Sequence, residues 1–344
     1  MATALTLVNR VRRELRIGET TTFTDLVSKR VLDAVNDSVA TIFGNWDWDC
    51  DIRHDGIQQC CPEINYAATG SITNGSATVT LPTASPSPFA TIETNRGVPY
   101  AVLTEDTAYG DTAIRINTHA SGISVVLDKA WPGTTDLSAT VRVVTNQFML
   151  PVTVRKVLSV RHQETQVRLE EANRTQAFDR IIQRPHETVD DQPELVLIGG
   201  QGRHLYNSGT TYTAAQTAAQ TWASMTIYPT PSTAILLHYS YVMAHAEMTL
   251  TTDTLDYVDR SLESLVVKLA FARCMQDSAV PAVNFGGIAN AGVALEQRVF
   301  GEVQALHRNQ ARDPGRHRVL GSNFSGSRGG IDFGRLPRNY GTGT

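Results

Sequence analysis

NWDWDCDIR, residues 45–53, is the stretch in which the hydrophobic pattern of the chain changes its period. Before it, apolar residues recur every three or four positions, as on one face of a helix. Within it they alternate, with Trp46, Trp48, Cys50 and Ile52 in one register, as on a β-strand. The stretch therefore predicts that a helical segment passes into a strand at Trp46, so the fold combines helices and strands.

Two helices are expected before Trp46. Apolar residues follow helical spacing from about residue 4 to 16, and Gly18 comes soon after. A second helical stripe begins near Thr24 and ends at Gly44, since glycine often closes a helix. Two such segments joined by a short loop predict an antiparallel helical hairpin.

The segment after the hairpin has the pattern of a β domain. SITNGSATVTL, residues 71–81, places Asn74-Gly75 between alternating residues, which is a strong hairpin signal. More strand patterns follow up to residue 150, so a small β-sandwich or barrel is expected. Strand patterns continue beyond Pro151, with one short helix predicted at 172–184, and helical patterns return near Leu262 and over 288–309.

These patterns predict an α+β fold. Its core would be a helical bundle of two N-terminal and two C-terminal helices, with an inserted β-sandwich or barrel domain, a second mixed β region and an extended C-terminal arm. The expected boundaries are 1–65 for the hairpin and exit strand, 66–150 for the inserted domain, 151–255 for the second β region, 256–310 for the C-terminal helices and 311–344 for the arm.

Composition excludes several broad roles. The chain of 344 residues has a formal charge of −4, so as a whole it does not resemble a nucleic-acid-binding or membrane-binding protein. It lacks a signal-peptide pattern and a run of about 20 apolar residues, so a soluble protein is expected. Its four cysteines form no CxxC pair, and no GxSxG or HExxH motif occurs. We therefore expect reduced thiols, no catalytic site, no cofactor and no metal.

Three alternating carboxylates, Asp47, Asp49 and Asp51, match the first ligands of an EF-hand loop. The match then fails, because Ile52 occupies the glycine position and Gln58 the glutamate position. Alternate residues of a strand also lie about 7 Å apart, too far for three carboxylates to hold one ion. We predict instead an acidic stripe that faces solvent, a neighbouring subunit or a channel, with Trp46 and Trp48 anchoring the strand in the core.

The last 34 residues are the most unusual local feature. They contain eight glycines, six arginines and two aspartates, so their net charge is about +4 and that of the remaining chain about −8. Three interpretations remain open: a disordered solubilising end, an arm that orders on a partner surface, and a nucleic-acid-binding tail. The residues expected to bind a partner are Arg312, Arg316, Arg318, Phe324, Arg328, Phe333, Arg335, Leu336, Arg338 and Tyr340.

The order of these motifs resembles that of the head-to-tail connector, or adaptor, subunits of tailed double-stranded DNA bacteriophages, especially short-tailed ones. The resemblance covers most of residues 4 to 310. The residues that carry it are Leu7, Asn9, Val11, Leu15, Val35, Asn36, Trp46 and Trp48, then Phe148, Leu150 and Pro151, and then Tyr228, Pro229 and Pro231.

This resemblance implies a structural virion protein at the head-tail junction, assembled in the host cytoplasm. It implies a homo-oligomeric ring, usually a dodecamer, docked on the portal protein by the C-terminal arm. The ring would line part of the DNA channel without sequence-specific binding and would carry a downstream tail or nozzle protein. Two alternatives stay open: a β-rich tail enzyme or glycan-binding protein, and a nucleic-acid-binding scaffold that acts through the tail.

Overall fold

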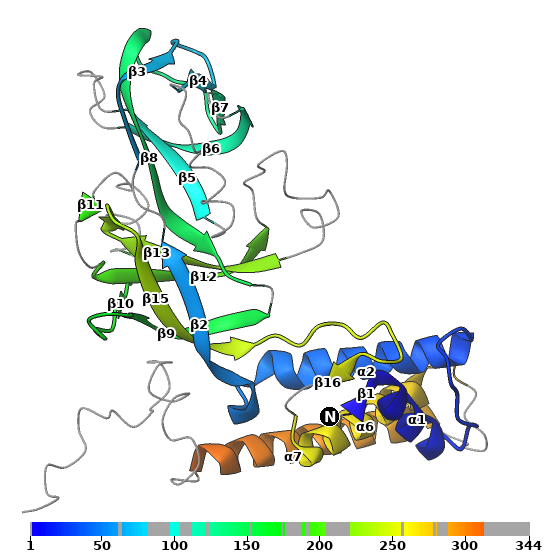
Figure 1. Cartoon of the computed structure of the whole chain (residues 1–344). Helices are drawn as coiled ribbons and strands as arrows, with labels where there is room; N and C mark the ends of the chain where they lie inside the picture. Colours follow the sequence, from blue (N-terminus) through cyan, green and yellow to red (C-terminus); the bar gives the residue numbers. More distant parts are fainter. Residues whose placement is uncertain are drawn as a thin grey trace, which may run out of the picture. The chain divides into compact units, whose positions relative to one another are not determined.

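The computed structural model describes residues 2–60, 64–81, 97–103, 112–121, 124–151, 153–173, 175, 188–189, 193–203, 221–255, 258–277, 280 and 288–312. The chain divides into two compact units (Figure 1). The helical unit is made of residues 1–53 and 242–344, the two ends of the chain. The β unit is made of residues 54–241, the middle of the chain.

The described part of the helical unit contains four helices, of which α6 is central because it packs against each of the other three. Its burial agrees with this position, since Leu262, Leu265 and Val267 lie on more than one side of the helix and are all buried. Two short strands, β1 and β16, pair antiparallel in the same unit. The elements are α1 (Ala4–Glu14), α2 (Leu26–Asn45), α6 (Arg260–Gln276), α7 (Ile288–Arg312), β1 (Ala2–Thr3) and β16 (Thr254–Leu255).

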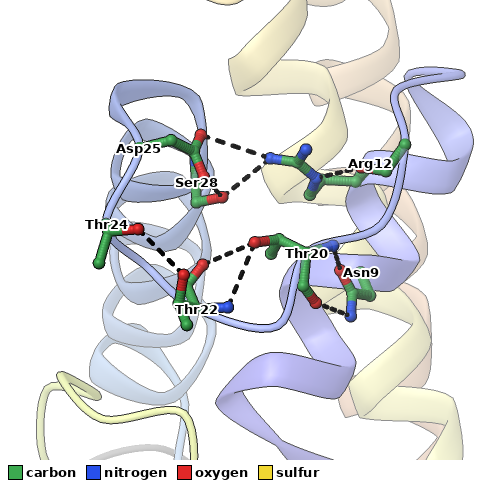
Figure 2. Close-up of polar contacts among 8 residues, drawn as sticks. Asn9, Arg12, Thr20, Thr22, Thr24, Asp25 and Ser28 are labelled. Carbon is green, nitrogen blue, oxygen red and sulfur yellow. Dashed lines mark hydrogen bonds and ion pairs between the residues drawn. The ribbon is translucent and has the colours of Figure 1, made fainter.

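The loop between α1 and α2 is fixed by two polar side chains of α1 (Figure 2). The Asn9 amide donates to the carbonyl of Thr20 and its oxygen accepts from the Thr20 backbone N–H, both at 2.9 Å. Arg12, only 8% exposed, donates to the Gly18 carbonyl at 2.6 Å and to the Ser28 hydroxyl at 2.9 Å. Arg12 thus turns inward and joins α1 to the first turn of α2.

Local signals explain where the helices begin and end. Asp25 caps α2 and Asp259 caps α6, each accepting a hydrogen bond from a backbone N–H of the first turn. At the end of α1 the left-handed residue is Arg16, with φ 58°, and not the glycine expected from the sequence. The helices predicted at 4–16, 24–44 and 288–309 are confirmed as α1, α2 and α7 to within about three residues at each end.

Six strands of the β unit form a closed barrel in the order β8-β3-β4-β7-β6-β5, because β5 also pairs with β8. Its interior is an apolar cluster that includes Ile116, Val125 and Val141. The predicted hairpin at Asn74-Gly75 is confirmed: Gly75 has φ 74° and β3 pairs antiparallel with β4. The barrel strands are β3 (Ile64–Ile72), β4 (Thr78–Thr80), β5 (Gly97–Leu103), β6 (Thr112–Ser121), β7 (Ser124–Leu127) and β8 (Asp136–Met149).

The long strand β8 continues beyond the barrel. One of its edges pairs first with β3 and then, through Gln147, Phe148 and Met149, with β13, which is followed in the sheet by β12 and β10. A separate three-stranded sheet has the order β2-β15-β9, and β11 pairs with β14. These strands are β2 (Ile52–Cys60), β9 (Val154–His162), β10 (Glu170–Glu171), β11 (Thr188–Val189), β12 (Leu195–Arg203), β13 (Thr221–Tyr228), β14 (Thr230–Pro231) and β15 (Ile235–Met243).

The predicted fold class is wrong. It treated the inserted β-sandwich or barrel and the second mixed β region as separate parts around a helical-bundle core. In the structure, β8 joins the two β regions in one nine-stranded sheet. The structure is α+β, with four helices in its described residues and a closed six-stranded barrel extended by further strands. Most of the helix predicted at 172–184 and nearly all of the arm fall outside the described residues. Among the described helices, none is long and apolar enough to cross a membrane.

Candidate functional site

The stretch 45–53 does not leave the helix as a strand. Strand β2 starts only at Ile52, after a 3-10 helix over Asp49–Asp51. The reason is Trp48, which is fully buried in the helical core and donates its indole N–H to the Ile42 carbonyl of α2 at 2.9 Å. Its ring also meets the His307 ring of α7 edge-on at 5.5 Å between centroids. Burial of this indole against two helices outweighs the alternating pattern, so the chain turns before it extends.

The predicted acidic stripe of Asp47, Asp49 and Asp51 is wrong at Asp51, which does not lie at the surface. Asp47 and Asp49 are half-buried, and Asp51 is fully buried. The Asp51 carboxylate accepts a hydrogen bond from His245 Nε2 at 2.9 Å, across 194 positions of sequence. It cannot meet a neighbouring subunit or line a channel, because the helical unit itself covers it.

The surroundings of Asp51 are those of a structural pair. The His245 ring lies against Phe43 with 4.4 Å between centroids. The Cys50 thiol donates to the same carboxylate oxygen at 3.6 Å, and burial together with the Asp51 charge raises the pKa of Cys50 to about 12. A thiol with so high a pKa is a poor nucleophile at neutral pH. The described residues hold no group of three or more His, Cys, Asp or Glu suited to a metal ion.

A groove lies over α1, α6 and α7 of the helical unit. Its volume is about 530 Å³. Its floor is apolar, formed by Val267, Phe271 and Leu295. Its rim carries four cations and two carboxylates, and we call the whole the charged groove. The rim residues are Arg10, Arg13, Glu14, Lys268, Arg298 and Glu302.

One carboxylate of the charged groove is held by two cations. Glu302 accepts from Lys268 Nζ at 2.7 Å and lies 3.4 Å from Arg298 Nε, and the Lys268 hydrogen bond is the main cause that lowers the pKa of Glu302. Across the groove, Arg10 lies 3.4 Å from the carboxylate of Glu263. Arg298 is nevertheless 77% exposed, so its guanidinium remains available to a partner. Arg13 also lies 3.3 Å from Glu19, so the groove combines apolar contact area with charges that are largely balanced within the chain.

Sequence reasoning missed both the Asp51 pair and the charged groove. The pair joins residues too far apart in the chain for any local pattern to indicate it. The groove had a weak signal, because Arg10 and Arg13 lie one helical turn apart, away from the buried stripe of α1. No local sequence pattern indicated that α6 and α7 complete the groove. In the predicted arm, Arg312 is the last residue of α7, and the arm residues from Arg316 onward lie outside the described residues.

Comparisons with known proteins give no family for this chain: no protein-family model and no curated protein matches it.

Proposed function

We propose that this chain is a structural subunit of a bacteriophage head-to-tail connector, forming the ring that joins the portal to the tail. The observation that carries the proposal is that residues of the connector resemblance lie at the joints of the helical unit. Leu7, Val11 and Leu15 are fully buried in its core, and Asn9 fixes the hairpin loop. The residues that carry the connector resemblance are thus the ones that hold the helical unit together, and this supports the proposal.

Asn36 supplies the second joint. Its amide donates to the Met248 carbonyl at 2.9 Å and its oxygen accepts from the Met248 backbone N–H at 3.1 Å. These two bonds attach α2 to the segment that leads into α6, so they join the two ends of the chain. An asparagine is suited to this task because its side chain both donates and accepts.

The charge distribution also supports a connector. The body of the chain is acidic and the last 34 residues are basic. An acidic channel wall would let DNA pass without sticking, since attraction to phosphates acts on any sequence. A basic arm that contains aromatic residues is suited to docking on the portal. In this proposal the protein is a non-catalytic virion component that also carries a downstream tail or nozzle protein.

Co-sedimentation with the portal protein of the same virus tests the proposal. The full chain should pellet with portal assemblies, and a variant that lacks residues 313–344, cut just after α7, should lose most of this binding. A variant in which only Asp33 is changed to Ala, at an exposed position of α2, serves as the control. Failure of the full chain to bind portal would refute the proposal. If the variant that lacks residues 313–344 loses DNA binding but keeps portal binding, the nucleic-acid-binding alternative is favoured instead.

A further inference from the structure

The tip of the hairpin between β3 and β4 carries an Asn-Gly pair. Asn74 and Gly75 occupy the centre of a turn that the Ser76 backbone N–H closes by donating to the Thr73 carbonyl at 2.9 Å. Gly75 has φ 74°, and Asn74 is exposed. Asn-Gly pairs are especially prone to spontaneous deamidation, because glycine has no side chain to keep its backbone nitrogen away from the asparagine side chain. The structure around the turn therefore decides whether this pair can react.

Deamidation of such a pair has two steps. The backbone nitrogen of Gly75 attacks Cγ of Asn74, so that a bond from this nitrogen to Cγ forms and the bond from Cγ to Nδ2 breaks. The Gly75 amide proton goes to the departing nitrogen, which leaves as ammonia. Water then opens the succinimide ring at either carbonyl and gives aspartate or isoaspartate. The reaction therefore requires that the Asn74 side chain fold back onto an available Gly75 nitrogen.

Both reacting groups are bound by residues 131–135, the loop before β8, which we call the clamp loop. Asn74 Nδ2 donates to the Gly133 carbonyl at 2.6 Å. The Gly75 backbone N–H donates to the Trp131 carbonyl at 2.8 Å. The side-chain amide thus points at the clamp loop and not back toward Gly75, and the Gly75 nitrogen keeps its proton in a hydrogen bond.

The clamp loop is itself fixed in place. Trp131 is only 2% exposed, and its indole N–H donates to the Thr134 carbonyl at 2.9 Å. Its backbone N–H donates to the Ser76 carbonyl at 2.8 Å, just after the turn. The Thr135 hydroxyl accepts from the Asn74 backbone N–H at 3.0 Å. Because the turn and the clamp loop are joined by all these bonds, the reacting groups can meet only after a local opening.

The product of deamidation cannot make the same bonds. Asn74 Nδ2 also donates to the Pro132 carbonyl at 3.2 Å, so two carbonyl oxygens face this amide. An ionised aspartate at this position has only acceptor oxygens and no donor for them. Two hydrogen bonds would be replaced by repulsion between oxygens, which costs more than the loss of the bonds alone. Conversion therefore loosens the turn from the clamp loop.

We propose that Asn74 is a deamidation site that the folded barrel protects, and that its conversion releases the β3–β4 turn from the clamp loop. The full chain, aged at one pH and temperature in denaturing guanidinium chloride and in sodium chloride of equal concentration, tests the protection. Peptide mass spectrometry measures the converted fraction of Asn74. Conversion should be at least about tenfold slower in sodium chloride, because it requires a local opening. Equal rates in the two solutions would overturn the protection.

A matched pair of variants tests the clamp loop in the folded chain. Thr135→Val removes the acceptor of the Asn74 backbone N–H and should speed conversion about threefold or more, as expected for one lost hydrogen bond. Thr80→Val changes an exposed threonine of β4 in the same hairpin and should stay within about twofold of the unaltered chain. If Thr135→Val ages no faster than Thr80→Val, the clamp loop does not protect Asn74.

Hydrogen exchange tests the release. Asn74→Asp installs the product of deamidation, whereas Asn74→Ala removes the amide without adding a charge. The backbone N–H groups of Gly75 and Trp131 should exchange about tenfold faster in Asn74→Asp than in the unaltered chain, and Asn74→Ala should show a smaller increase. Exchange in Asn74→Asp as slow as in the unaltered chain would overturn the release. Neither outcome depends on whether the chain is a connector.

Discussion

At the scale of single residues, Asp51 depends on one imidazole for its place in the core. Its carboxylate is fully buried, and His245 lies 2.9 Å from one of its oxygens. Removing one partner of a buried pair leaves the other without compensation, which costs roughly 3 to 5 kcal/mol. His245→Ala should therefore lower the free energy of unfolding by about 3 kcal/mol, measured by urea denaturation followed by circular dichroism.

A double variant distinguishes the loss of the Asp51–His245 interaction from a simple loss of side-chain packing. Asp51→Asn alone should cost about 1 kcal/mol, because a neutral amide is cheaper to bury than a carboxylate. For the same reason, Asp51→Asn introduced into His245→Ala should restore part of the lost stability. If the two losses add in full, the carboxylate and imidazole are not coupled.

The contribution of Asp25 to the stability of the fold should depend on pH. Hydrogen bonds from the Ser28 side chain and backbone N–H lower the pKa of Asp25. A carboxyl whose pKa is lower in the folded state stabilises the fold above its ordinary pKa of about 3.9, and this contribution is lost as the pH falls toward the folded value. Asp25→Ala should cost about 1 kcal/mol at pH 7 through the lost helix cap. The difference from the unaltered chain should shrink on acidification below about pH 4.

The matched control for Asp25 is Asp33→Ala, at an exposed interior position of the same helix. This change should alter stability by no more than about 0.5 kcal/mol, since alanine favours a helix slightly and no cap is lost. Equal effects of the two substitutions at pH 7 would contradict the capping role of Asp25.

At the scale of elements, the contact between α6 and α7 depends on a glycine. A methyl group on Gly292 of α7 would lie 2.8 Å from the Ala272 carbonyl oxygen of α6, whereas around Gly301 of the same helix there is open space. Gly301→Ala should stabilise by about 0.5 to 1 kcal/mol through helix propensity. Gly292→Ala should destabilise despite the same propensity gain, because α7 must move away from α6. Thermal unfolding of the two variants should shift in opposite directions, and equal shifts would contradict this packing.

Elements also show what the sequence could and could not predict. The helices α2 and α7 were predictable because their apolar stripes are local and periodic, and the hairpin at Gly75 because its turn chemistry is local. The closed barrel was not predictable, since its closure pairs β5 with β8 between residues far apart in the sequence, such as Gly97 with Phe148. The strand expected at Trp46 failed because Trp48 packs against α2 and α7, and no local pattern contains that contact.

At the scale of the whole molecule, the proposed connector function makes the chain one copy of a repeating assembly. Residues of the connector resemblance hold the helical unit together, through buried side chains such as Leu7 and through the bonds of Asn36 to Met248. The candidate site was only partly predictable: a docking role for the chain was expected, but the groove is lined by α1, α6 and α7, which meet only through tertiary folding.

Electron microscopy of the purified full chain mixed with the portal protein of the same virus tests the central claim most directly. A closed ring of this chain, stacked coaxially on the portal, is the expected result, with one contact repeated between all neighbouring copies. Portal particles that carry no added ring at any concentration of the chain would contradict it.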